Sequence, residues 1–134
     1  MGPRSRARRA DEALAVPSGL SYTLLAYNLR CVLFLETAIF TRQIVALLSD
    51  NEYATLQAFI STDPEAGNLI RGGGGIRKLR WSVQGRGKSG GIRVIYYWLK
   101  RNGQVLMLLA YPKSRKDTLT DAETAVLRKL VKEL

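Results

Sequence analysis

Two tight connections in the second half of the chain constrain its fold more than any other feature of the sequence. An Asn-Gly pair at 102–103, the strongest short signal for a β-hairpin, separates two segments rich in β-branched and aromatic residues, 92–99 and 104–111. A Gly-rich, basic loop at 84–91 separates the first of these from another segment with a period of two, 76–83. Strands joined by hairpins are antiparallel neighbours. The sequence therefore predicts a three-stranded antiparallel meander.

Helical periodicity marks three other segments. The residues Ser-Asp-Asn-Glu at 49–52 form a capping box, and the apolar stripe after it ends before Pro64. A second capping box, Thr-Asp-Ala-Glu at 120–123, begins a C-terminal helix. A shorter helix with Thr41 as its predicted cap lies ahead of the first capping box. The short apolar run at 32–36 precedes these helices and predicts a buried strand.

This order of elements predicts an α+β domain over residues 32–134. Its small antiparallel sheet consists of the N-terminal strand and the meander, packed with two N-terminal helices and one C-terminal helix. Residues 1–31 are Arg-rich, then Ala-rich, and show no sustained period, so we expect a flexible N-terminal extension. Because a bacterial gene can begin at a valine codon, the position of Val32 also leaves open a mis-assigned start. A chain beginning at Val32 is expected to fold cooperatively.

Positive charge gathers in one stretch of the chain. Residues 66–116 contain twelve Lys or Arg and no Asp or Glu, whereas nine basic residues elsewhere accompany all eleven acids. Such segregation is the electrostatic footprint expected for a polyanion, above all a nucleic acid. The alternative is a solvated basic face on an ordinary domain.

The residues that the chain lacks exclude several kinds of chemistry. It has no histidine and a single cysteine, Cys31, so an internal disulfide is excluded and a zinc or haem site is disfavoured. Ser/His/Asp and Cys/His nucleophilic sites are excluded as well. No apolar run reaches the roughly 18 to 20 residues that span a bilayer. We therefore expect a cytoplasmic protein without metal or cofactor, whose chemistry rests on lysine, arginine, tyrosine or carboxylate groups.

Three basic segments together resemble the toxins of bacterial toxin–antitoxin modules in the RelE superfamily, and within it the HigB-like branch. They are the strand at 74–80, the hairpin and Arg-x-x-Tyr strand at 85–97, and the Tyr-x-Lys segment at 111–116. The resemblance covers roughly residues 32–134. It implies a RelE/ParE-like fold and a ribosome-dependent messenger RNA endonuclease that acts in the decoding site. It also implies a cognate helix-turn-helix antitoxin, through which alone the toxin would meet DNA, and no membrane partner.

The same resemblance assigns site residues by position. Lys78 and Arg80 match the family's basic pair on the strand that faces RNA, Arg93 matches the arginine that opens the next strand, and Lys113 matches the basic cluster after the last strand. These four are the predicted catalytic residues. The predicted RNA-binding residues are Arg77, Arg86, Lys88, Tyr97, Tyr111, Arg115 and Lys116. A tyrosine that the family often carries near its C-terminus has no clear counterpart, so its role would fall to Tyr111 or Tyr97.

Cations can promote RNA cleavage by the RNA's own 2′-hydroxyl, because they can orient it, take its proton and stabilise the phosphorane. Planar guanidinium forks suit Arg80 and Arg93 to phosphate oxygens. Crowding by like charges favours the neutral form of a lysine, which makes Lys78 a candidate base, while Lys113 could assist the leaving group. Both arginines are expected to project from the sheet and bury little. Arg93 must then share a face with Lys78, a register that alternation permits but does not prove.

Two other functions stay open at this stage. Relatives of the superfamily poison DNA gyrase instead of cutting RNA, but they tend to lack the strand and C-terminal cations that this chain carries. A plain RNA- or ribosome-binding module without chemistry is the third reading. Cleavage of a translated message that is lost on substitution of Lys78 or Arg93 would distinguish the nuclease from both.

Overall fold

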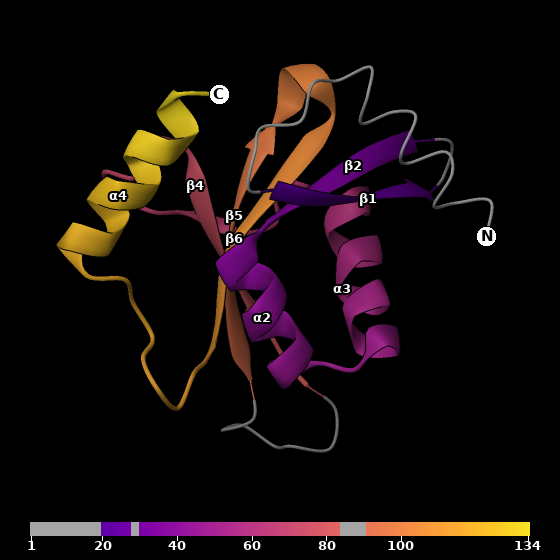
Figure 1. Ribbon diagram of the computed structural model, residues 1–134, viewed down its shortest axis with the longest axis horizontal. Coiled ribbons are helices and arrows are strands. Elements are labelled where there is room, and N and C mark those ends of the chain that lie inside the picture. The colour runs from indigo at the N-terminus through magenta and orange to yellow at the C-terminus, as the bar shows by residue number, and fades with distance from the viewer. Residues whose placement is uncertain (1–19, 28–29, 84–90) are drawn as a thin grey trace.

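One six-stranded sheet, in the order β1-β2-β6-β5-β4-β3, forms the centre of the computed structural model (Figure 1). The structure describes residues 20–27, 30–83 and 91–134, with side chains from Val32 onward. The strands are β1 Leu20–Tyr27, β2 Arg30–Thr37, β3 Asn68–Leu69, β4 Ile76–Trp81, β5 Ile92–Leu99 and β6 Gln104–Pro112. Helices α2 (Ala38–Leu47) and α3 (Asp50–Thr62) cover one face, and α4 (Asp121–Lys132) covers the other. The predicted α+β class is confirmed.

The predicted meander is present as β4, β5 and β6, each antiparallel to the next. Its second connection is longer than the two-residue turn that an Asn-Gly pair suggests. Leu99 pairs with Gln104, so four residues connect the strands, and three of them form the short 3₁₀ segment Lys100–Asn102. Gly103 closes this connection with a φ of 65°, in the left-handed region that glycine adopts without strain.

The N-terminal part of the sheet corrects two predictions. β2 pairs with β6 in parallel, so the sheet is mixed and not wholly antiparallel; the two helices between these strands in the chain form the long connection that parallel pairing needs. β1 pairs with β2 along its whole length, from Leu20 opposite Thr37 to Tyr27 opposite Arg30. Residues 20–27, 30 and 31, predicted as part of a flexible extension, therefore belong to the sheet. Leu-Ser-Tyr-Thr-Leu at 20–24 alternates apolar and polar residues, and this short period of two is the signal that the sequence interpretation missed.

Two of the three helix caps are the residues predicted from the sequence. Both capping boxes form as predicted, at Ser49 with Glu52 and at Thr120 with Glu123. The third cap is Thr37 and not Thr41, because the Oγ1 of Thr37 accepts a hydrogen bond of 3.0 Å from the backbone of Phe40. α2 therefore follows β2 without a loop, and this direct junction fixes the helix against the sheet.

The central strands β2, β5 and β6 are buried on both faces over most of their length. Between the sheet and the α2–α3 layer lie side chains that include Phe34, Phe40, Leu56, Ile60, Tyr96 and Met107. Between it and α4 lie Leu33, Leu35, Ile95, Leu106, Leu108 and Leu127. Strands buried on both sides are nearly continuous apolar runs, as in β2, β5 and β6. α4 packs on β4. The same face also carries the charged residues described below.

A β-bulge in β6 changes which residues face α4. Ile95 pairs with Leu109 while Tyr96 pairs with Met107, so Leu108 is an extra residue in β6. Met107 packs on the α2–α3 side, whereas Leu108 and, further along, Tyr111 pack on the α4 side. Strict alternation from Met107 would have placed Tyr111 with Met107. The bulge therefore brings Tyr111 to the α4 face.

Removal of residues 1–31 is expected to destabilise the domain, contrary to the sequence-based expectation, because it deletes β1 and the first two residues of β2. Thermal melts should compare chains that begin at Leu20 and at Val32. The chain from Val32 should melt more than about 5 °C lower. Equal transitions would show that β1 adds nothing to stability.

Candidate functional site

Three predicted cations share the α4 face of the sheet. Arg80 on β4 lies directly opposite Arg93 on β5. Lys78 is two residues before Arg80 on β4, on the same face, and lies opposite Ile95. The register that an RNA site requires is therefore present. Like charges directly opposite each other on neighbouring strands repel. This pair of arginines therefore needs a counter-charge or an anionic ligand.

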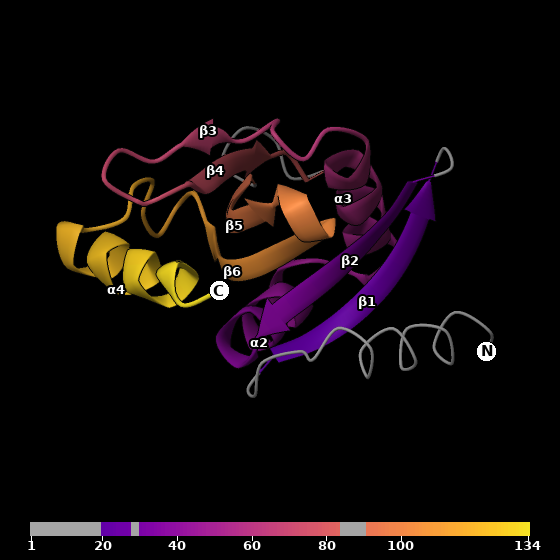
Figure 2. The ribbon, with the colours of Figure 1, turned by 90° about the horizontal axis from the view of Figure 1, so that it is seen from above.

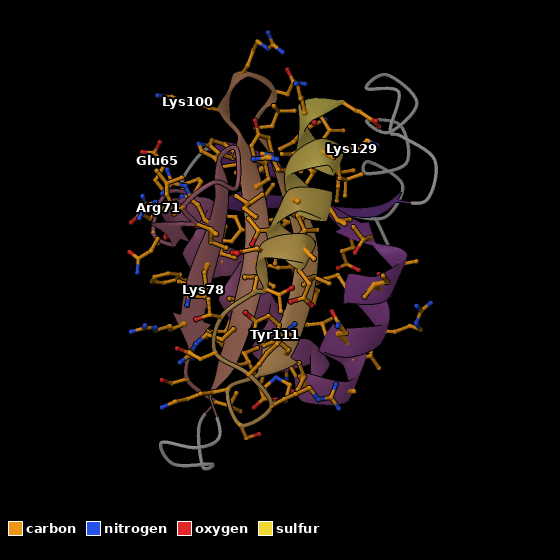
Figure 3. The ribbon with its side chains drawn as sticks, turned by 90° about the vertical axis from the view of Figure 1, so that its left-hand side faces the viewer. Glu65, Arg71, Lys78, Lys100, Tyr111 and Lys129 are labelled. Carbon is orange, nitrogen blue, oxygen red and sulfur yellow. The ribbon has the colours of Figure 1, made fainter. Side chains whose placement is uncertain are left out.

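The connection from β6 to α4, residues 113–120, runs beside these cations, and we call it the strap. At its start the backbone N–H of Lys113 donates to the carbonyl of Gly91, with 3.0 Å between nitrogen and oxygen. At its end Leu119 is buried in the α4-side core and Thr120 caps α4. Figure 3 looks onto this face, with Lys78 and Tyr111 near the end of α4 that the strap leads into. The strap is thus held at both ends.

Asp117 of the strap contacts two of the cations. The Nε of Arg93 donates to its Oδ1 at 2.6 Å, and the Nζ of Lys78 donates to its main-chain oxygen at 3.1 Å. The hydrogen bond from Arg93 lowers the pKa of Asp117, and the positive charges of Arg93, Lys78 and Arg80 add to this effect. The carboxylate is therefore ionised at neutral pH. Its contribution to stability is present above the usual pKa of aspartate and is lost as pH falls through the lowered pKa.

The cations differ in their access to solvent. Arg80 and Lys113 are exposed and Lys78 is half-buried, but the side chain of Arg93 is only 7% exposed. The expectation that Arg93 projects from the sheet is therefore wrong. Its guanidinium bends back, donating from Nε to Asp117 and, at 3.4 Å, from a terminal nitrogen to the carbonyl of Ile92. Arg93 thus places a positive charge beneath the surface.

Tyr111 lies opposite Arg93 on β6 and is 3% exposed. Burial raises the pKa of its hydroxyl, and the charge of Asp117 raises it further. Among the described residues this hydroxyl has no hydrogen-bond partner. An unsatisfied buried polar group costs about 1–3 kcal/mol, and groups of this kind often belong to functional sites. Of the two tyrosines named in the sequence analysis, Tyr111 is therefore the one that lies beside Arg93.

Lys116 links Tyr111 to α4. Its Nζ lies 5.2 Å from the centroid of the Tyr111 ring and donates to the carboxylate of Glu123. The other carboxylate oxygen of Glu123 accepts from the backbone of Thr120 in the capping box. One glutamate therefore both caps the helix and fixes a lysine over the aromatic ring.

The family whose model matches residues 64–134 is described as the RelE toxin of the RelE/RelB toxin–antitoxin system. The match covers more than half of the 134 residues and contains every cation of the site and the whole strap. This chain belongs to the RelE toxin family. It is therefore the toxin of a toxin–antitoxin system, and membership implies an antitoxin partner. In the part of the chain that the structure describes, no helix has the length and apolarity to cross a membrane.

The fold does not bring all of the predicted RNA-binding residues to this face. Arg77 points to the opposite face, because it neighbours Lys78 on a strand, and donates to the carbonyls of Glu65 and Gly67 at 3.1 and 2.8 Å. Arg115 lines a groove with residues of α2, including Arg42. These two predictions are not supported by position.

Of the other predicted RNA-binding residues, Tyr97 lies away from the cluster of Lys78, Arg80 and Arg93. Tyr97 pairs with Ile76, two positions beyond Lys78 along β4, where its ring packs close to Gly75. Arg86 and Lys88 lie outside the described residues.

Sequence reasoning did not assign Asp117 and Glu123, two carboxylates of the site, to it. One signal was present, because Asp117 is the first acid after the long acid-free stretch at 66–116. Each carboxylate binds a cationic side chain. Within residues 20–27, 30–83 and 91–134, no three histidine, cysteine, aspartate or glutamate side chains gather as metal ligands would.

Proposed function

We propose that this RelE-family toxin is an endonuclease that cuts messenger RNA on the ribosome and thereby inhibits translation. The observation that supports it best is the cluster of Lys78, Arg80 and Arg93 on one face of the sheet, beside the unpaired hydroxyl of Tyr111. A chain without histidine must use such groups for acid–base and phosphate chemistry.

The reaction that fits these groups is attack of a 2′-hydroxyl on the neighbouring phosphate. The bond from the 2′-oxygen to phosphorus forms while the bond to the 5′-oxygen breaks, leaving a cyclic phosphate and a 5′-hydroxyl. Lys78 takes the proton of the 2′-hydroxyl, and Lys113 gives a proton to the leaving 5′-oxygen. Exposed Arg80 binds the phosphate oxygens.

Arg93 has a different role from Arg80 in this proposal. Its buried charge acts on the phosphorane from the sheet side, through protein and not through water. Electrostatic interactions are stronger in protein than in water. Tyr111, buried beside Arg93, has a hydroxyl with no hydrogen-bond partner among the described residues. Lys116 holds the ring of Tyr111 in place.

The finer assignments belong to the same proposal. The residues at 74–97 support a place in the HigB-like branch, and with it a helix-turn-helix antitoxin and the decoding site as the place of action. The cations on the sheet face argue against a gyrase poison of the same fold. No metal or cofactor takes part in the proposed steps, and the expected location is the cytoplasm.

The test is a reconstituted translation reaction in which the 5′ ends of one message are mapped after addition of toxin. Wild-type toxin should create new 5′ ends within codons, and Arg80→Ala should lower their rate of formation by about 10²- to 10³-fold. Arg101→Ala is the matched control, because it removes the same charge from the exposed β5–β6 connection. Arrest of translation without new 5′ ends would indicate a binding module, and inhibition of gyrase supercoiling without RNA cleavage would indicate a gyrase poison.

A further inference from the structure

Asp117 binds two cations of the proposed site, Lys78 and Arg93, but has no role in the chemical steps given above. Its carboxylate binds Arg93, and its main-chain oxygen binds Lys78, so one strap residue contacts both the buried cation and the candidate base. The carboxylate itself is 49% exposed, whereas the Arg93 side chain that it binds is only 7% exposed. These two contacts restrain the positions of the Arg93 guanidinium and the Lys78 ammonium group.

The cluster needs this restraint because its charges repel one another. Arg80 and Arg93 are directly opposite across two strands, with Lys78 at the next position on the same face. Without a counter-charge, each long side chain would lower its energy by turning away from the others, and its rotamer freedom favours that result. Asp117 offsets the repulsion at Arg93, the residue from which solvent is largely excluded.

The geometry of the contact orients Arg93 as well as neutralising it. The hydrogen bond is made at Nε, so it restrains the plane of the guanidinium at its base without occupying both terminal nitrogens. The strap is itself anchored, by the bond from Lys113 to Gly91 and by the burial of Leu119. Asp117 is therefore held in place before any RNA arrives, which is the condition for preorganised electrostatic stabilisation.

We propose that Asp117 is a positioning residue of the cleavage reaction, which fixes Arg93 and Lys78 relative to the scissile phosphate. This inference rests on the proposed nuclease function. Asp117 does not touch the RNA in this role. Its carboxylate acts through Arg93 and its main-chain oxygen through Lys78. Substitution of the side chain removes the contact with Arg93, so it should impair the chemical step and not the attraction of RNA.

The experiment compares Asp117→Ala and Asp117→Asn with the matched control Asp121→Asn. Asp121 is exposed in the first turn of α4, and its substitution makes the same change of charge. Asp117→Ala should lower the single-turnover rate of ribosome-dependent cleavage by up to about 100-fold, the loss expected when a reacting group is misplaced by about 1 Å. Asp117→Asn, whose amide oxygen can still accept from Nε, should retain an intermediate rate.

Affinity for RNA separates positioning from simple structural support. Removal of a negative charge should leave the Kd for an RNA oligonucleotide unchanged or lower it, even as cleavage slows. Asp121→Asn should cut at the wild-type rate. Cleavage by Asp117→Ala at the wild-type rate or faster would overturn the proposal, and faster cleavage would mean that Asp117 competes with phosphate for Arg93.

A readout that does not require activity keeps this inference separate from the proposed function. In ¹H–¹⁵N spectra, the Nε–H of Arg93 should give a slowly exchanging signal in the wild type that disappears in Asp117→Ala. If wild-type toxin does not cut messages at all, the nuclease proposal fails, and this signal alone decides whether Asp117 holds Arg93. Its persistence in Asp117→Ala would overturn the positioning role in either case.

Discussion

The purified toxin is expected to cut a message on programmed ribosomes at least about 10⁴ times faster than the same message free in solution. The cations of the site can attract and neutralise phosphate, but they cannot by themselves align a 2′-hydroxyl with the leaving oxygen of a flexible strand. Orientation of that kind is worth up to roughly 7–11 kcal/mol in favourable cases. The ribosome would supply it by holding the codon in a bent conformation.

The measurement is the rate of appearance of new 5′ ends, with and without ribosomes stalled on a defined codon. Binding to free RNA provides the control, and it should weaken steeply with salt, as expected for phosphate contacts made by lysine and arginine. Equal rates of cleavage in the two reactions would contradict ribosome dependence and would move the orienting function to the protein.

Substitution of Arg93 should abolish growth inhibition, with a loss of about 10²- to 10³-fold in cleavage for Arg93→Ala. The reason is its buried position, since a charge largely shielded from solvent stabilises a developing negative charge more strongly than an exposed one. Arg93→Lys keeps the charge but lacks the planar group and the Nε that binds Asp117. It should therefore also be strongly impaired.

Growth curves at matched protein levels, together with thermal melts, test this expectation. The melts are required because Arg93 is largely buried and its loss could affect folding. The exposed Arg101→Ala again controls for the change in net charge. Full toxicity of both Arg93 variants would show that Arg93 is not required for cleavage.

Local sequence signals predicted most of the fold. Each capping box specifies a helix start within four residues, and the antiparallel order of the meander follows from its short connections. The pairing of β1 with β2 and the parallel pairing of β2 with β6 could not be predicted in this way. Partners such as Leu33 and Gln104 lie far apart in the chain, and a continuous apolar run does not indicate which strand it pairs with.

The candidate site was predictable as a set of cations but not as an arrangement. Alternation along β4 placed Lys78 and Arg80 on one face, and it also places Arg77 on the other, although the sequence interpretation grouped all three. The partner of Arg93 is Asp117, which lies in a loop whose path no local pattern encodes. A site built from a strand pair and a distant loop becomes visible only when the chain is folded.

Because of the bulge at Leu108, the side of the sheet on which Tyr111 lies depends on whether the number of residues before it in β6 is odd or even. Because successive side chains of a strand alternate between two sides, an insertion or deletion of one residue between Met107 and Tyr111 would exchange Tyr111 with Ala110. A phenol would then enter the core beside α2, and a methyl group would take its place beside Arg93. Evolution can therefore vary the identity of residues in this part of β6 more easily than their number.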